Sequence, residues 1–143
     1  MSIVVFTTII TGVCVFVTGH ILVKGILDPY LSFKEQLGMV SAILLREQNK
    51  IINLSASNEV IDEIKHASAL LLSKSNAVPL YGAFVKLRLL PQHKSIIKAS
   101  RNLNLIASTL EGASNITPRK DYVLVNDSLN AIGRDLKIGR AHV

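Results

Sequence analysis

The chain opens with a long apolar run in which the first charged side chain is Lys24. Residues 1–23 contain no Asp, Glu, Lys or Arg, and Ile, Val, Leu and Phe dominate from Ile3 onward. An α-helix rises about 1.5 Å per residue, so residues 2–23 would span roughly 33 Å, against about 30 Å for the hydrocarbon core of a bilayer. The pattern therefore predicts a transmembrane anchor over residues 1–27.

Two other interpretations of this run fit it less well. A secretory signal peptide has a positively charged start, a shorter apolar core and a small-x-small cleavage site, for which Val17-Thr18-Gly19 is a poor match. A pair of buried strands would suit the many Ile, Val and Thr residues. The run, however, has neither a turn signal nor period-two alternation, which leaves a single helix as the best interpretation.

Beyond the anchor, apolar residues recur at the spacing of helices. Asp28-Pro29 is predicted to end the anchor and to open a helix that ends near Asn53. Proline suits a first helical turn, and the aspartate before it can cap free amides. The apolar stripe of this helix consists of Tyr30, Phe33, Leu37, Val40, Leu44 and Ile51.

A serine-rich loop separates this helix from the next one, which is expected between Glu59 and Asn76. Acidic residues in its first turns match the positive end of the helix dipole. Its apolar stripe consists of Val60, Ile61, Ile64, Ala67, Ser68, Leu71 and Leu72. The segment that follows, residues 79–90, is short and apolar, and it fits either a short helix or a segment at the membrane interface.

Two more helices are expected toward the C-terminus. Pro91 opens the first, whose apolar face consists of Ile96, Ala99, Ser100, Leu103, Ile106, Ala107 and Leu110. After a loop over residues 112–117, Thr117-Pro118 provides a cap and a first-turn proline for the final helix. The stripe of that helix alternates steps of three and four residues, as in a bundle: Tyr122, Val125, Leu129, Ile132 and Leu136.

No strand pattern and no internal repeat follow the anchor. The sequence therefore predicts an all-α protein, with an N-terminal single transmembrane helix (residues 1–27) followed by a small four- or five-helix domain (residues 28–137). Residues 138–143 match the translation of a common sequencing adapter in one reading frame. They are a candidate non-native tail, and no function is assigned to Arg140 or His142.

Charge divides the chain in the same way as hydropathy. All 16 Lys and Arg residues and all 10 Asp and Glu residues lie at or after Lys24, so the formal net charge of +6 belongs to the part that follows the apolar run. Cys14, the single cysteine, lies within that run, which excludes an intramolecular disulfide and a thiolate metal cluster. Lys24 and Lys34 follow the run closely. Positive flanks stay inside, so we expect the N-terminus outside and the domain in the cytoplasm.

The largest charge asymmetry lies between Glu63 and Glu111, where the sequence has no acidic residue. Five basic residues of this interval form a candidate ridge for an anionic partner: Lys86, Arg88, Lys94, Lys98 and Arg101. The last three recur at i, i+4 and i+7, which places them on one helix face. Anionic lipid head groups are the expected partner of such a ridge at a leaflet, since each basic residue near the surface contributes about 1 kcal/mol.

Two alternatives to a lipid-binding ridge stay open. The basic residues can equally be ordinary solvated side chains, with Tyr81, Phe84 and Leu87 buried in the core. Nucleic acid is a less favoured anionic partner, because the sequence shows neither a recognition helix after a tight turn nor aromatic residues on a sheet.

The sequence contains no constellation that indicates catalysis. Glu63-x-x-His66 is half of the pattern of a di-iron carboxylate bundle, but a second copy and two further inward carboxylates are missing. A nucleophile elbow, a phosphate-binding glycine loop and zinc-ligand spacing do not occur. We therefore expect no enzyme, no catalytic residue, no metal and no cofactor.

Small residues mark one face of the predicted anchor. Thr8 and Gly12 form a small-xxx-small pair, and Gly19 returns to the same side one heptad later. Such faces let membrane helices approach closely. Thr8, Gly12 and Gly19 are therefore a candidate membrane-helix contact face, through which the protein would self-associate.

Short motifs along most of the chain resemble those of one protein group. They are Gly19 and Ile21, Lys24, Asp28-Pro29, Phe33-Lys34, Leu37-Gly38, residues 77–82, Leu90-Pro91 and residues 97–110. With these motifs the chain resembles a group of small uncharacterised bacterial proteins that have one N-terminal membrane helix and a helical cytoplasmic part. The resemblance extends to about Leu136. It implies a bacterial inner-membrane location and an all-helical build, but no activity.

These observations favour a single-pass protein of the bacterial inner (cytoplasmic) membrane. Its helical cytoplasmic domain is expected to act as a non-catalytic interaction or regulatory module, with a second copy or another protein as its partner. The alternative is a membrane-surface reader of anionic lipid, or less favourably of nucleic acid, through the basic ridge.

Overall fold

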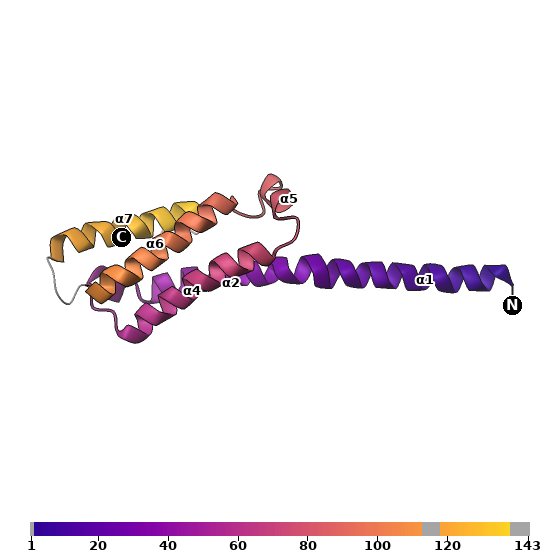
Figure 1. Ribbon diagram of the computed structural model, residues 1–143, viewed down its shortest axis with the longest axis horizontal. Helices are drawn as coiled ribbons and strands as arrows, with labels where there is room; N and C mark the ends of the chain where they lie inside the picture. Colours follow the sequence, from indigo (N-terminus) through magenta and orange to yellow (C-terminus); the bar gives the residue numbers. More distant parts are fainter. Residues whose placement is uncertain (1, 113–117, 138–143) are drawn as a thin grey trace.

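The computed structural model describes residues 2–112 and 118–137, and all regular structure in these ranges is helical. The helices are α1 (Ile3–Leu22), the π-helical turn η1 (Val23–Leu27), α2 (Asp28–Arg46), α3 (Gln48–Ile52), α4 (Asn58–Ala77), α5 (Tyr81–Lys86), α6 (His93–Gly112) and α7 (Pro118–Asp135). α1 projects from a bundle built from the four long helices α2, α4, α6 and α7 (Figure 1). The predicted class, an apolar N-terminal helix followed by a small all-α domain, is confirmed. The predicted cap at Thr117 and the candidate tail at residues 138–143 lie outside the described residues.

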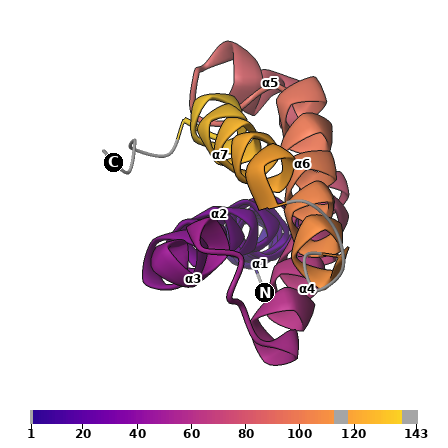
Figure 2. The same ribbon diagram turned by 90° about the vertical axis from the view of Figure 1, so that its left-hand side faces the viewer.

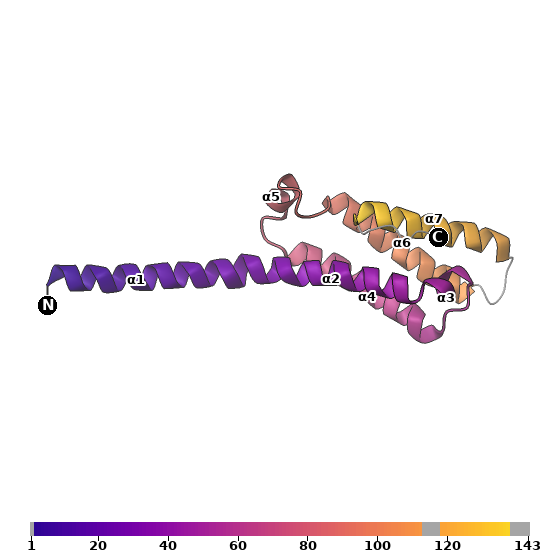
Figure 3. The ribbon, with the colours of Figure 1, turned by 180° about the vertical axis from the view of Figure 1, so that it is seen from behind.

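α1, η1 and α2 form one continuous helix of 44 residues, Ile3–Arg46. α2 begins at Asp28 with Pro29 in its first turn, as predicted, but the prediction that Asp28-Pro29 breaks the chain from the anchor helix is wrong. Pro29 has no N–H to donate to the preceding turn, and the wider turn η1 absorbs this loss, with the Asp28 N–H bonded to the Val23 carbonyl five residues back. As a result, α1 runs into the bundle without a break (Figure 3).

The long helices enclose one hydrophobic core. α4 packs against α2 and α6, α7 packs against α6, and α3 reaches α7 (Figure 2). α1 contributes no buried residue. The largest fully buried apolar side chains are Phe33, Val40, Ile51, Ile64, Leu71, Ile96, Leu103, Ile106, Val125 and Ile132.

The apolar stripes predicted for α4 and α6 are the core faces of these helices. Every predicted position on α6 is buried, and so is every predicted position on α4 except Leu72, which is half-buried. Ile132 of α7 and Leu136, directly after its end, are buried as predicted, but Tyr122 of α7 is exposed. Tyr122 lies in the second turn of α7, whose N-terminal end extends past the end of α6 (Figures 1 and 3).

The helix that was expected to end near Asn53 is two helices. α2 ends at Arg46, Glu47 has the non-helical angles φ −99° and ψ 9°, and α3 follows. This break lets α3 turn toward α7, which buries Ile51 completely. The contact between α3 and α7 accompanies this break, which the periodicity alone does not reveal.

Buried polar side chains join the helices inside the bundle. Ser68 Oγ on α4 donates to the Ser100 carbonyl on α6 at 2.9 Å, and the two hydroxyl oxygens are also 2.9 Å apart. On the other side of α4, Gln36 Nε2 donates to the Ala67 carbonyl at 3.3 Å. Each of these groups has a partner, as buried polar groups require.

Candidate interaction surfaces

α1 is bare of contacts with the domain. It belongs to the one continuous helix of the described residues that is long and apolar enough to cross a membrane, Ile3–Arg46. An 18-residue stretch of this helix has a mean hydropathy of 2.0, and none of that stretch is buried. A Cβ atom added at Gly12 or Gly19 would meet nothing within 4 Å, so the fold of a single chain does not require glycine there. Thr8 Oγ1 donates to the Val4 carbonyl at 2.8 Å, so its hydroxyl is already bonded within α1. The predicted contact face of Thr8, Gly12 and Gly19 is thus fully open.

Charges are unequally distributed between the two ends of the bundle. The end from which α1 leaves, called here the α1 end, consists of the start of α2, the end of α4, α5, the start of α6 and the end of α7 (Figures 1 and 3). Its acidic residues are Asp28, Glu35 and Asp135. Its basic residues are Lys24, Lys34, Lys74, Lys86, Arg88, Lys94, Lys98, Arg134 and Lys137.

The opposite end, called here the acidic end, holds six acidic residues and five basic ones, Arg46, Lys50, Lys65, Arg119 and Lys120. The acidic residues there are Glu47, Glu59, Asp62, Glu63, Glu111 and Asp121. Lys65 Nζ lies 2.6 Å from Glu111 Oε1, and Arg46 and Lys50 also lie in ion pairs. At the α1 end, Lys24 pairs with Asp28, whereas the five predicted ridge residues form no ion pair with any described residue. Their charge is available to a partner.

The structure brings the predicted ridge together with the end of α7. Lys94, Lys98 and Arg101 are exposed on α6, as their spacing predicts. Lys98 and Arg101 border a shallow depression together with Arg134 and Asp135 of α7. Lys86 and Arg88 border a neighbouring depression, which Arg134, Asp135 and Lys137 also line. Sequence reasoning missed Arg134 of α7 and Lys137, which follows the end of α7. Antiparallel packing of α6 and α7 sets them beside the ridge.

α5 is held to the bundle by its aromatic face. The rings of Tyr30 and Phe84 stack with centroids 4.8 Å apart, and Tyr81 meets Phe33 edge to face at 5.9 Å. The Tyr81 hydroxyl donates to the Pro91 carbonyl at 2.8 Å, and burial raises the pKa of Tyr81 to about 12. Leu87, in contrast, is exposed. The interpretation that Tyr81, Phe84 and Leu87 are core residues therefore holds for the two aromatic residues and is wrong for Leu87.

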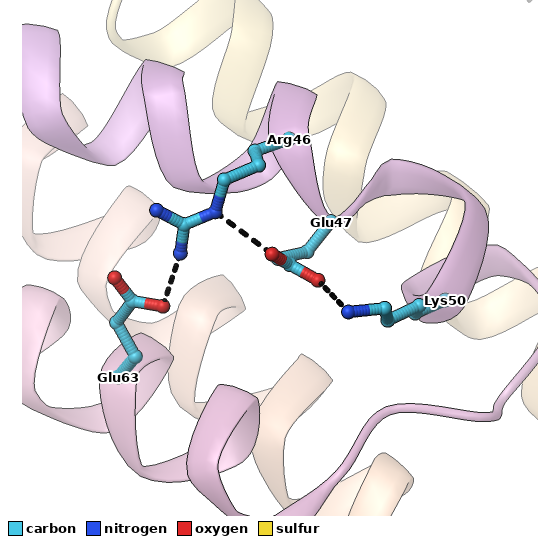
Figure 4. A network of polar contacts seen from close by, with 4 residues as sticks. All are labelled: Arg46, Glu47, Lys50 and Glu63. Carbon is cyan, nitrogen blue, oxygen red and sulfur yellow. Dashed lines mark hydrogen bonds and ion pairs between the residues drawn. The ribbon is translucent and has the colours of Figure 1, made fainter.

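A polar network ties α2 and α3 to α4 at the acidic end (Figure 4). Arg46 Nε lies 2.8 Å from Glu47 Oε1, its Nη2 atom lies 2.5 Å from Glu63 Oε2, and Lys50 Nζ lies 2.7 Å from Glu47 Oε2. Contacts with Lys50 first, and then with Arg46, hold the pKa of the Glu47 carboxyl below its usual range. The pKa of Arg46 is raised, first by Glu47 and then by Glu63.

This network also accounts for the acidic residue of the Glu63-x-x-His66 motif. Glu63 binds Arg46, and His66 is exposed to solvent. Among the described residues no group of three His, Cys, Asp or Glu side chains could hold a metal ion. The contacts of Glu63 are those of a helix-joining ion pair.

α6 and α7 also form an apolar groove on the outside of the bundle. Exposed Leu105, Val123 and Leu124 form its apolar part, and its volume is about 690 Å³. The rest of its lining consists of Ala131 and the polar residues Asn102, Asp127, Ser128, Asn130 and Arg134. Exposed Tyr122 directly precedes Val123 on α7. Contiguous exposed apolar side chains of this kind are typical of protein contact sites.

Comparison with known proteins yields no relative. No protein-family model, no curated protein and no solved structure matches this chain. The function proposed below rests on the residues themselves.

Proposed function

We propose that this chain is a single-pass protein of the bacterial inner (cytoplasmic) membrane, and that its helical cytoplasmic domain is a non-catalytic interaction or regulatory module. The observation that carries the proposal is the continuous helix Ile3–Arg46. Its first part, α1, is apolar and has no buried residue, whereas its second part, α2, contributes core residues such as Phe33 and Val40. One rigid element would then hold the domain at a fixed position against the membrane.

The charges next to α1 support a cytoplasmic domain. The α1 end of the bundle is rich in Lys and Arg, and positively charged segments beside a membrane helix stay on the cytoplasmic side. The apolar groove of Leu105, Val123 and Leu124 supports an interaction role, since it offers a protein partner an apolar surface away from the anchor. The buried polar side chains Gln36, Ser68 and Ser100 serve helix packing, which fits a scaffold better than a reaction centre.

Topology can be tested by cysteine labelling in intact bacterial cells. Cys14→Ser removes the native thiol, and single cysteines are then placed at the exposed positions Ser2 and Asn104. A membrane-impermeant maleimide should label Ser2→Cys in intact cells and Asn104→Cys only after permeabilisation. The reverse pattern would overturn the orientation, and release of the protein from membranes by alkaline carbonate would overturn the anchor.

The interaction role is tested by affinity capture of the full-length protein from native membranes. Leu124→Asp places a charge in the apolar groove, whereas Asn126→Asp places the same charge at an exposed position of α7 that does not line the groove. A partner that binds the apolar surface should be lost with Leu124→Asp and kept with Asn126→Asp. A partner that survives both changes would contradict a role for the groove.

A second candidate function is recognition of anionic lipid by the ridge of Lys86, Arg88, Lys94, Lys98 and Arg101. The observation that favours it is the lack of ion pairs for these residues among the described part of the chain, next to Arg134 and Lys137. Nucleic acid would bind the same basic residues through its phosphates. The test therefore offers the detergent-solubilised full-length protein both anionic vesicles and duplex DNA.

The variant K94Q/K98Q/R101Q lowers the net charge on the ridge face by three. The control variant N49D/N53D/S108D lowers the net charge of the protein by the same amount, but at exposed positions near the acidic end. Lipid recognition predicts salt-sensitive vesicle binding that the ridge variant weakens more than the control does. Equal weakening by the two variants would show that only net charge matters, and binding to DNA alone would contradict the lipid partner.

A further inference from the structure

The residues around α5 expose leucines that a soluble domain would normally cover. The side chains of Leu80 and Leu87 are 66% and 68% exposed, and Leu89 is nearly half exposed. Lys86 and Arg88 alternate with the last two of these leucines along the chain. Apolar side chains interleaved with basic ones are typical of segments that lie in the interface of a membrane.

The bundle holds this segment in a shape that directs these leucines outward. Leu80 and Arg88 adopt the left-handed backbone region, with φ of 53° and 59°, which side chains with a Cβ rarely occupy. Between them, Phe84 stacks on Tyr30. After them, Lys34 Nζ donates to the Leu89 carbonyl at 3.4 Å, and Leu90 is buried. The exposed leucines therefore belong to a segment that contacts with the bundle hold in place.

The continuous helix sets the depth of this segment relative to the membrane. Apolar residues continue through Leu27, and Asp28 compensates the charge of Lys24 at 3.2 Å. If the hydrocarbon core ends near Leu27, Tyr30 lies about 4.5 Å beyond it along the helix. The headgroup region is about 5–7 Å thick on each side. The ring of Phe84 in α5 stacks on the ring of Tyr30. α5 would therefore lie at about the same depth as Tyr30, in the headgroup region.

We propose that α5 and its two flanking turns form a second membrane contact: Leu80, Leu87 and Leu89 enter the headgroup region of the leaflet that holds α1, and Lys86 and Arg88 bind its anionic phosphates. This proposal rests on the proposed anchoring by α1. An anionic leaflet is the occupant because the tether places it against this surface, and because the α1 end carries cations without ion pairs among the described residues. With contacts at α1 and α5, the domain would be fixed in tilt and rotation as well as in height.

The test measures the depth of single fluorescent labels on the full-length protein reconstituted into vesicles. The native thiol of Cys14 reports on the anchor, Leu87→Cys in a Cys14→Ser background reports on α5, and Leu45→Cys in the same background is the control. Leu45 is an exposed leucine of the same continuous helix, near the acidic end. Vesicles contain phosphatidylcholine alone or with one third phosphatidylglycerol, and lipids with a quencher in the chain or near the head group report depth.

The proposal predicts three different responses. The label on Cys14 is quenched by chain-labelled lipid, the label on Leu87→Cys is quenched by headgroup-labelled lipid, and the label on Leu45→Cys is quenched by aqueous iodide. Headgroup quenching at Leu87→Cys should be at least twofold stronger than at Leu45→Cys, and stronger with phosphatidylglycerol. K86Q/R88Q should remove this dependence on phosphatidylglycerol, whereas N49D/N53D, which lowers the net charge equally near the acidic end, should not.

The outcomes separate this proposal from the one on which it rests. If Cys14 is quenched from the chains and Leu87→Cys behaves like Leu45→Cys, the anchor stands and the α5 contact is refuted. If Cys14 itself is open to iodide, the anchor and the α5 contact both fall. Equal quenching at Leu87→Cys with and without phosphatidylglycerol would refute the role of Lys86 and Arg88.

Discussion

Replacing Leu103 by alanine tests the orientation of α6, on which the position of the basic ridge depends. Leu103 is 1% exposed, whereas Leu105, two residues away on the same helix, is 40% exposed. If α6 is oriented as described, the same chemical change should have very different costs at these two positions. The pair therefore forms its own matched control.

The magnitudes follow from burial. Leu103→Ala removes three buried carbon groups, which at about 0.8 kcal/mol each gives roughly 2.4 kcal/mol of lost transfer free energy. The cavity left between packed helices adds to this, so the free energy of unfolding should fall by about 3–4 kcal/mol. Leu105→Ala leaves a gap that water fills, and its cost should be about 1 kcal/mol or less.

The assay is urea unfolding of the full-length protein in detergent micelles, followed by circular dichroism at constant micelle concentration. The free energy extrapolated to zero urea should differ by about 2 kcal/mol or more between the two variants. Equal costs, or a larger cost for Leu105→Ala, would refute the orientation of α6. Lys94, Lys98 and Arg101 would then not share an exposed face.

Three further predictions concern the polar network, the α5 support and the anchor. The pKa of Glu47 is depressed below its ordinary value of 4.5, so its contribution to stability is present above that pH and is lost as pH falls through the folded-state value. The thermal midpoint of Glu47→Gln should therefore lie below that of the wild type at neutral pH and converge with it in acid, and a constant difference would contradict the ion pairs. Tyr81 has a raised pKa of about 12 against an ordinary value of 10.0, so its contribution is present below pH 10.0 and is lost as pH rises through about 12. Tyr81→Phe should remove the late phenolate from an absorbance titration and flatten the fall in stability above pH 10.0, whereas an unchanged titration would contradict burial of the hydroxyl. Gly12→Leu should leave the thermal midpoint of the domain unchanged, because no atom lies within 4 Å of the added Cβ atom. If Thr8, Gly12 and Gly19 mediate self-association, chemical crosslinking in membranes should fall in this variant but not in Val15→Leu, and equal crosslinking would contradict that face.

The periodicity of apolar residues predicted most of the core. The stripes of α4 and α6 were correct because a helix that packs in a bundle must bury residues at 3.6-residue spacing, and this constraint is local. The prediction that Tyr122 belongs to the buried stripe was wrong, because the burial of this residue depends on how far α7 extends past α6. That extent is a property of the two helices together. The predicted break at Asp28-Pro29 was wrong because a single π turn accommodates the proline.

The candidate surfaces were only partly predictable. The absence of acidic residues between Glu63 and Glu111 indicated a basic segment, and the spacing of Lys94, Lys98 and Arg101 indicated one exposed face. Arg134 and Lys137 gave no such signal, because they are distant in sequence and join the ridge only through antiparallel packing. The exposure of Leu87 likewise depends on the turns that flank α5.

The sequence by itself determined the class of this protein: an apolar helix long enough to cross a bilayer, followed by amphipathic helices that bury one face each. Hydropathy and helical period are properties of neighbouring residues, so they can be read directly along the chain. Only the tertiary structure decided that one helix connects anchor and bundle without a break and that α5 packs beside the point where they meet. It also decided that cations without ion pairs among the described residues gather at that end, while Arg46, Lys50 and Lys65 are paired at the other. These features depend on which helix ends meet in space, and helix packing brings together residues that no local pattern connects.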